Sequence, residues 1–254
     1  MCELFGVTSD RKVCINDYLK IFFSHSIEHH NGWGLALLDN MGVAIEKEPV
    51  RAVDSRYLRN RLTGRVETSV CMAHIRKATI GDVSFKNTHP FTGCDKGGRR
   101  WVFVHNGTIF ESASLTRYLY EQEGTTDSER ILLYIIDRVD KEIERKCDGN
   151  SKCRLIENIV LELTPGNKVN FLLYDGTYMY VHKNEPGTLF RKEEDGTVFF
   201  STHPLDDTSW EEVEQNTLLV YRSGKLIYRG QQHDNTYHHD EAKMKLIYLD
   251  HAML

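Results

Sequence analysis

Short segments in which apolar and polar residues alternate dominate the chain. Such alternation is typical of β-strands that bury one face. Many of the strand-like segments follow this pattern, and others, such as WVFVHN near the middle, are short apolar runs. The pattern predicts strands over residues 2–7, 33–39, 42–48, 68–75, 101–106, 170–175, 178–183, 188–192, 197–201, 217–221 and 225–229.

Helical periodicity appears in fewer places. The clearest helix is expected over 127–146, where Ile131, Tyr134, Ile135 and Val139 form one apolar stripe. Other helices are expected over 15–27, 55–62 and 154–164, the last ending at the Pro165-Gly166 pair.

The strands come in consecutive runs with a few helices between them, rather than in strict alternation with helices. This order predicts an α+β fold with largely antiparallel sheets and helices packed outside. No internal repeat or low-complexity linker divides the chain, so we expect a single domain over residues 2–254. The polar segment 230–254 is a candidate for a peripheral tail that covers part of the body.

Composition and charge exclude several classes of protein. Of the 254 residues, 40% are hydrophobic and 27% charged, as in an ordinary globular protein, and the net charge is −5. This charge gives no reason to expect nucleic acid or an anionic membrane as a partner. We see no membrane span and no secretory signal, and six scattered cysteines indicate a cytoplasmic protein with reduced thiols.

Neither a metal nor a cofactor is expected. Cys147 and Cys153 lack the tight C-x-x-C spacing of a zinc site, and we favour a solvated tail over a metal site for three histidines near the C-terminus, His233, His238 and His239.

Cys2 has two interpretations. It is either an ordinary thiol buried in a starting strand or, after removal of Met1, an N-terminal nucleophile. In the second case its own α-amine, with a reference pKa of about 8, can act as general base to the thiol.

Three further positions in the sequence leave similar alternatives open. Arg76, at the end of a strand, can clamp a carboxylate or join a surface ion pair. The Asn106-Gly107 pair can form an oxyanion hole or a hairpin turn. Asp127 can bind an ammonium group, or it or Thr126 can cap the following helix.

The order of the motifs carries a resemblance. MCELFG, NGWG, AHIRKATIG, NTHPF, HNGTI and TDSE follow one another over residues 2–130, and FFSTHPLDDTSWEEV follows at 199–213. In this order the motifs resemble the class II glutamine amidotransferase domain, and most closely its small stand-alone members, which include hydrolases of γ-glutamyl compounds.

The resemblance implies a fold and a set of site residues. The fold is the four-layer αββα sandwich of N-terminal-nucleophile hydrolases, with two mainly antiparallel sheets between helices. The implied catalytic residues are Cys2 as nucleophile, with a depressed thiol pKa, and Asn106 and Gly107 as the oxyanion hole. The implied substrate-binding residues are Arg76 for the α-carboxylate, Asp127 for the α-ammonium, Thr79, the supporting His89, and Gly32 and Trp33 in a turn over the pocket.

Two departures from the family pattern affect the expected function. Ile80 stands where some members have a histidine, which argues against strict ammonia transfer, and we see too few residues after Asp127 for a synthase domain. We therefore expect hydrolysis of glutamine or a small γ-glutamyl conjugate through a Cys2 thioester. The alternatives are a glutaminase subunit that supplies ammonia to a separate synthetase partner, and a catalytically silent γ-glutamyl-binding protein, which retention of Met1 would favour.

Overall fold

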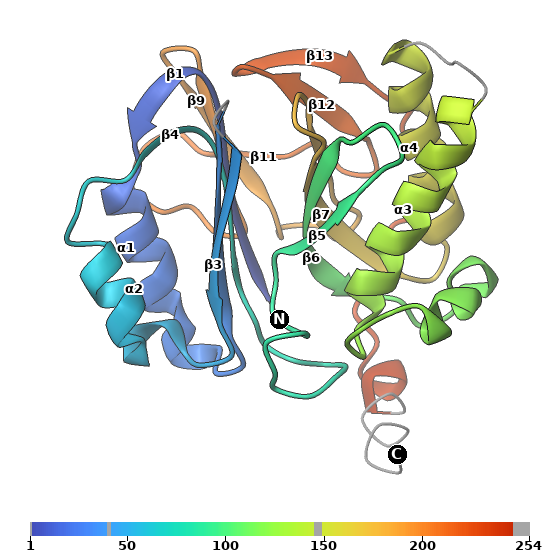
Figure 1. The fold of residues 1–254 in the computed structure, drawn as a ribbon, viewed down its shortest axis with the longest axis horizontal. Coiled ribbons are helices and arrows are strands. Elements are labelled where there is room, and N and C mark those ends of the chain that lie inside the picture. The colour runs from blue at the N-terminus through green and yellow to red at the C-terminus, as the bar shows by residue number, and fades with distance from the viewer. Residues whose placement is uncertain (1, 40–41, 145–148, 246–254) are drawn as a thin grey trace.

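The computed structural model describes residues 2–39, 42–144 and 149–245. Two β-sheets lie face to face, and helices cover the outer face of each (Figure 1). α1 (Asn16–Ser24) and α2 (Arg56–Arg61) cover one sheet, while α3 (Asp127–Glu144) and α4 (Gly149–Leu163) cover the other. The expected α+β fold with a four-layer αββα arrangement is confirmed.

The first sheet places the N-terminal strand near its middle. The strand order is β11-β9-β10-β1-β4-β2-β3, and all neighbours are antiparallel. The bounds are β11 Glu211–Glu212, β9 Phe190–Glu194, β10 Thr197–Ser201, β1 Glu3–Cys14, β4 Glu67–Ile75, β2 Trp33–Asp39 and β3 Gly42–Glu48.

The second sheet is also antiparallel, with the order β13-β12-β8-β7-β6-β5. The bounds are β13 Lys225–Arg229, β12 Leu219–Arg222, β8 Met179–His182, β7 Lys168–Tyr174, β6 Arg100–Thr108 and β5 Phe91–Cys94.

Every strand predicted from alternation is present, with shifts at its ends. The strands β5 and β11 were not predicted, because a two- to four-residue edge strand is too short to show a period of two. The helix expected over 15–27 divides into α1 and the 3₁₀ helix η1 (His25–Glu28), and α4 begins earlier than expected. Two further 3₁₀ helices, η2 (Ala52–Asp54) and η3 (Ala113–Tyr120), were not predicted.

The strand alternation divides the core into three parts. Leu4 of β1 packs in the cluster between the two sheets, whereas Phe5 packs on the opposite face against α1. A third cluster lies between the second sheet and α3 and α4. The side chains of β1 therefore point alternately between the sheets and toward the helices, as the period of a strand requires.

No helix within the described residues is both long and apolar enough to cross a membrane.

The glycines of NGWG allow close packing. A Cβ atom on Gly34 would overlap the backbone carbonyl of His89, so the loop before β5 rests directly on β2. We predict that Gly34→Ala lowers the free energy of unfolding by about 2–3 kcal/mol through overpacking, measured by urea denaturation. Gly64→Ala is the control, because its nearest neighbour, the Arg61 carbonyl oxygen, lies 3.7 Å from the added atom. Equal stability of the two variants would contradict the prediction.

Candidate active site

A small cavity lies where β1 begins, between the two sheets. Its walls include Cys2, Thr79, Asn106 and Gly107, four of the residues predicted for the site. The remaining lining residues are Lys77, Thr108, Lys168, Tyr237, His239 and Met244. A larger groove of about 480 Å³ between α1, η2 and α2 contains none of the predicted residues. Four of the predicted residues therefore meet at the small cavity, and none of them at the larger groove.

Cys2 is half-buried and lies next to the loop that follows β4. Its Sγ atom is 3.4 Å from the carbonyl oxygen of Lys77 and 3.4 Å from the amide nitrogen of the same residue. Burial raises the pKa of the Cys2 thiol, although the Lys77 N–H and the charges of Arg76 and Lys168 oppose this shift. The expectation of a depressed pKa is thus wrong, because loss of solvation outweighs the neighbouring positive charges. The protonated thiol needs a base to become a nucleophile.

Asn106 and Gly107 lie inside β6, where they pair with Asn170 and Val169 of β7. The hairpin alternative is therefore wrong, and the strand continues to Thr108 instead of ending at the Asn-Gly pair. Asn106 is 2% exposed, and its Nδ2 group has no hydrogen-bond partner among the described residues. An amide donor that is buried, unpaired and next to a thiol is suited to receive a developing negative charge.

Arg76 is buried instead of lying on the surface. Its guanidinium donates to the carbonyl oxygens of Asp82 at 2.7 Å, Ile80 at 2.9 Å and Gly81 at 2.9 Å. These contacts fix the loop 77–82 next to Cys2, and the surface ion-pair alternative is wrong. Burial lowers the pKa of Arg76, while the charges of Cys2 and Asp127 raise it.

Asp127 is the first residue of α3, and its carboxylate is fixed by backbone donors. The N–H groups of Ile109 and Ser128 each donate to it at 2.8 Å. The Ser128 hydroxyl lies 3.3 Å from the same carboxylate and 3.0 Å from the Nδ1 atom of His105. Thr126 provides the helix cap, since its hydroxyl accepts the N–H of Glu129 at 3.3 Å. Capping thus belongs to Thr126, which leaves Asp127 as the candidate ammonium ligand.

Five predicted site residues are not among those that line the cavity: Arg76 and Asp127, described above, and His89, Trp33 and Gly32. The ring of His89 stacks on His74 with centroids 3.9 Å apart, and burial holds the pKa of His89 well below its usual range. Trp33 points toward the helices and donates from Nε1 to Glu48 at 3.1 Å. Gly32 adopts a φ of 137° beside Thr88. These residues support the neighbouring loop and do not contact Cys2 in the described cavity.

Lys168 was not predicted as a site residue, although it lines the cavity. It is 3% exposed, and its Nζ atom lies 2.5 Å from the carboxylate of Glu185. Burial lowers the pKa of Lys168, and the Glu185 charge raises it. A lysine at the start of the largely apolar strand KVNFLLY was the only sequence signal for this residue.

The C-terminal segment forms the outer wall of the cavity. The Tyr237 N–H donates to the Asn184 carbonyl at 2.8 Å, and the Tyr237 ring stacks on Phe110 with centroids 6.0 Å apart. Tyr237, His239 and Met244 line the cavity, so three residues of the expected tail help to form its wall. Residues 246–254 lie outside the described residues.

No group of His, Cys, Asp or Glu residues in the described part of the chain is arranged to hold a metal ion. Cys153 is a free thiol, and Cys147 lies outside the described residues. His233 lies 3.1 Å from His182, between ring nitrogens.

Comparisons with known proteins identify the family of the chain. Residues 1–192 match the family described as "Glutamine amidotransferases class-II". The chain belongs to this family. Class II glutamine amidotransferases are amidohydrolases with an N-terminal cysteine nucleophile, and the chain is therefore an enzyme of this type.

Among similar proteins, this amidotransferase is 28% identical to MJ1515 of Methanocaldococcus jannaschii, over 91% of this chain and 72% of that protein. It is also 28% identical to YafJ of Escherichia coli, named as a candidate glutamine amidotransferase, over 72% of each chain. Its fold resembles the glutamine phosphoribosylpyrophosphate amidotransferase of Bacillus subtilis, with a TM-score of 0.69, 17% identity and 91% of this chain covered. The match spans 49% of that solved structure.

The buried Lys168–Glu185 pair allows a stability prediction for this amidotransferase. Lys168→Met leaves the Glu185 carboxylate buried without its cation, and we expect a loss of about 3–5 kcal/mol in urea denaturation. Lys168→Met with Glu185→Leu should recover most of this loss, because both desolvated charges are then absent. The control is Lys20→Met at the exposed Lys20–Asp17 pair, 3.5 Å apart, which should change stability by less than about 0.5 kcal/mol. A double variant no more stable than Lys168→Met would contradict the account.

Proposed function

We propose that this amidotransferase hydrolyses the γ-glutamyl amide bond of glutamine, or of a small γ-glutamyl conjugate, through a thioester on Cys2. The observation that carries the proposal is the buried Asn106 Nδ2 group, which has no partner among the described residues and lines the same cavity as Cys2. A buried donor left unpaired costs about 1–3 kcal/mol, which is reasonable where a reaction intermediate supplies the acceptor.

The proposed base is the α-amine that removal of Met1 would create on Cys2. Burial raises the pKa of the thiol, so the amine has to accept the thiol proton before attack. The sulfur then bonds to the amide carbon, and the carbonyl oxygen becomes an oxyanion that accepts from Asn106 and from the Gly107 N–H. Collapse breaks the carbon–nitrogen bond, the leaving amine takes the proton, and water hydrolyses the thioester to glutamate and the free thiol.

The glutamyl head would be held by one cation and one anion. Arg76 uses three of its five N–H groups to donate hydrogen bonds to loop carbonyls. Its two remaining N–H groups would donate to the α-carboxylate of the substrate. The N–H groups of Ile109 and Ser128 occupy only part of the acceptor capacity of the Asp127 carboxylate. The remaining lone pairs of its oxygens would accept hydrogen bonds from the α-ammonium group of the substrate. Thr79 completes the wall beside Cys2.

Substrate entry requires movement of the walls. The cavity has a volume of about 30 Å³, which is the space of about one water molecule. A glutamyl group fits only when lining side chains move outward.

A glutaminase subunit that supplies ammonia to a separate synthetase is the second candidate. The chain corresponds to about half of the Bacillus subtilis amidotransferase, whose name includes a second substrate, phosphoribosylpyrophosphate. A partner that supplies the second half would raise the glutaminase rate several-fold, whereas a hydrolase would be unaffected.

The nucleophile assignment is tested with 6-diazo-5-oxo-norleucine, a glutamine-mimicking electrophile. We expect loss of Met1 and one covalent adduct on Cys2, measured by intact mass and peptide mapping. Cys2→Ala should give no adduct and no hydrolysis, because the reacting sulfur is absent. Cys94→Ala, at an exposed free cysteine, is the matched control and should react normally. Retained Met1 without an adduct would instead favour a silent γ-glutamyl-binding protein.

The oxyanion assignment predicts a separate kinetic effect. Asn106→Ala should lower kcat for γ-glutamyl amide hydrolysis by about 10²–10³-fold, because the donor acts mainly in the transition state. KM should change by less than about threefold. Asn158→Ala, at an exposed position of α4, is the control and should leave kcat unchanged. Unaltered kcat in Asn106→Ala would remove this residue from the oxyanion hole.

A further inference from the structure

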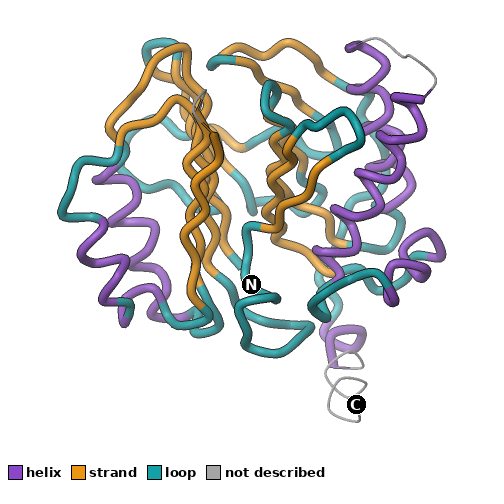
Figure 2. Tube along the Cα trace, in the orientation of Figure 1, coloured by secondary structure: helices purple, strands orange, loops and turns teal. Residues whose placement is uncertain are grey.

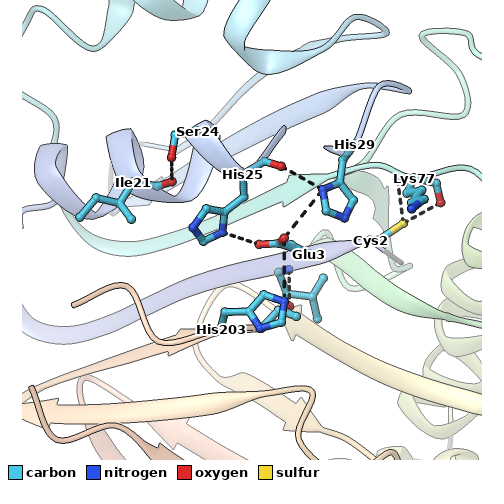
Figure 3. Close-up of polar contacts among 10 residues, drawn as sticks. Cys2, Glu3, Ile21, Ser24, His25, His29, Lys77 and His203 are labelled. Atoms are coloured by element: carbon cyan, nitrogen blue, oxygen red, sulfur yellow. Dashed lines mark hydrogen bonds and ion pairs between the residues drawn. The ribbon is translucent and has the colours of Figure 1, made fainter. Parts of the chain in front are cut away.

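The residue after Cys2 is a buried acid. The Glu3 carboxylate is on the helix-facing side of β1, and the residue is 4% exposed. His25 Nδ1 lies 2.8 Å from this carboxylate, His29 Nδ1 3.8 Å and His203 Nε2 4.0 Å. Figure 3 shows the three imidazoles around Glu3, while the Cys2 side chain points away toward Lys77. A carboxylate this well enclosed requires a reason for its burial.

The three imidazoles come from two segments that are distant in sequence. His25 and His29 belong to η1 and the residue after it, and His203 follows β10. The hydrogen bond from His25 to Glu3 raises the pKa of His25 against the effect of burial. The hydrogen bond of 2.8 Å between His25 Nδ1 and the Glu3 carboxylate is the shortest contact of the cluster. His29 is oriented by its own contact, 3.0 Å from Nδ1 to the His25 carbonyl.

Apart from the contacts of Glu3, few interactions among the described residues hold Cys2 in place. Glu3 is the first residue of β1 to pair with β4, opposite Ile75, and pairing with β10 begins only at Phe5. Thr202 holds the next residue, since Leu4 N–H donates to its hydroxyl at 2.8 Å and Thr202 N–H donates to the Leu4 carbonyl at 3.0 Å. Among the residues that the structure describes, the Cys2 side chain makes hydrogen-bond contacts only with Lys77, both at 3.4 Å. An N-terminal residue moves freely unless its neighbours hold it.

We propose that Glu3, clamped by His25 and the flanking His29 and His203, is a positioning residue that aligns Cys2 with the Asn106 donor. The inference rests on the proposed Cys2 thioester chemistry and goes beyond it, because Glu3 lies on the other face of the strand and does not contact the substrate cavity. Burial of Glu3 fixes the backbone of β1 one residue from the nucleophile. A displacement of the reacting sulfur by about 1 Å can lower the rate about 100-fold. The interactions of Glu3 therefore act at a point of the chain where accurate placement affects the reaction rate.

The test compares the inactivation kinetics of full-length variants with 6-diazo-5-oxo-norleucine. Glu3→Ala should lower the maximal inactivation rate by about 10- to 100-fold and leave the half-saturating concentration within about twofold. Glu3→Gln keeps an acceptor for His25 and should recover part of the rate. His25→Gln, which keeps a donor toward Glu3, should be milder than His25→Leu. Glu28→Ala, an exposed acid of η1, is the matched control and should react like the wild type.

Each preparation is treated with methionine aminopeptidase, and intact mass verifies that Cys2 is the first residue before the assay. Urea denaturation of the same samples shows that the variants are folded. A wild-type rate in Glu3→Ala would overturn the inference. So would a loss of rate in Glu3→Ala that Glu3→Gln does not recover at all, or a rise in half-saturating concentration that accounts for the whole effect. If the wild type itself forms no adduct on Cys2, the proposed function fails, which is a distinct outcome.

Discussion

The period of two along β1 is the constraint on which the site depends. Because successive side chains of a strand point to opposite faces, Cys2 and Leu4 face the space between the sheets, whereas Glu3 and Phe5 face the helices. The strand lies between β4 and β10, so both its edges are paired. One strand end therefore presents a reactive sulfur on one face and an anchoring carboxylate on the other.

The pairing of β1 with β4 brings the remaining parts of the site together. It places the loop after β4 against Cys2, and the buried Arg76 guanidinium fixes that loop through backbone carbonyls. The N-terminus lies beside this loop at one end of the sandwich (Figure 2). Asn106 approaches from the second sheet, so the cavity forms where the two sheets meet.

The interior around the cavity is polar for a packed core. His89, His105 and Asn106 each have a buried side-chain nitrogen without a hydrogen-bond partner in the described part of the chain. Burial lowers the pKa values of His89 and His105, so both rings are neutral. Unpaired buried groups lower stability by about 1–3 kcal/mol each. Their concentration in the interior next to Asn106, where His89 stacks on His74 and His74 contacts the His105 carbonyl, is consistent with a region arranged for binding and chemistry at the expense of stability.

By itself, the sequence determined the elements and the chemical groups. The strand-like patterns predicted every strand except the short edge strands β5 and β11. The order of the motifs that contain Cys2, Arg76 and Asn106 identified the family, and the family implied the fold. These features are local, since alternation reflects burial of one strand face and a motif lies in a few neighbouring residues.

Only the tertiary structure decided how these groups are used. In the local sequence, the Asn106-Gly107 pair is typical of a hairpin turn. In the structure it is part of a strand, because it pairs with β7, which lies about 60 residues later in the chain. The raised pKa of the Cys2 thiol, the cavity wall formed by Tyr237 and the clamp between Glu3 and His203 depend on segments that are distant in sequence. Solvation and contact between such segments follow from long-range packing, which no local pattern contains.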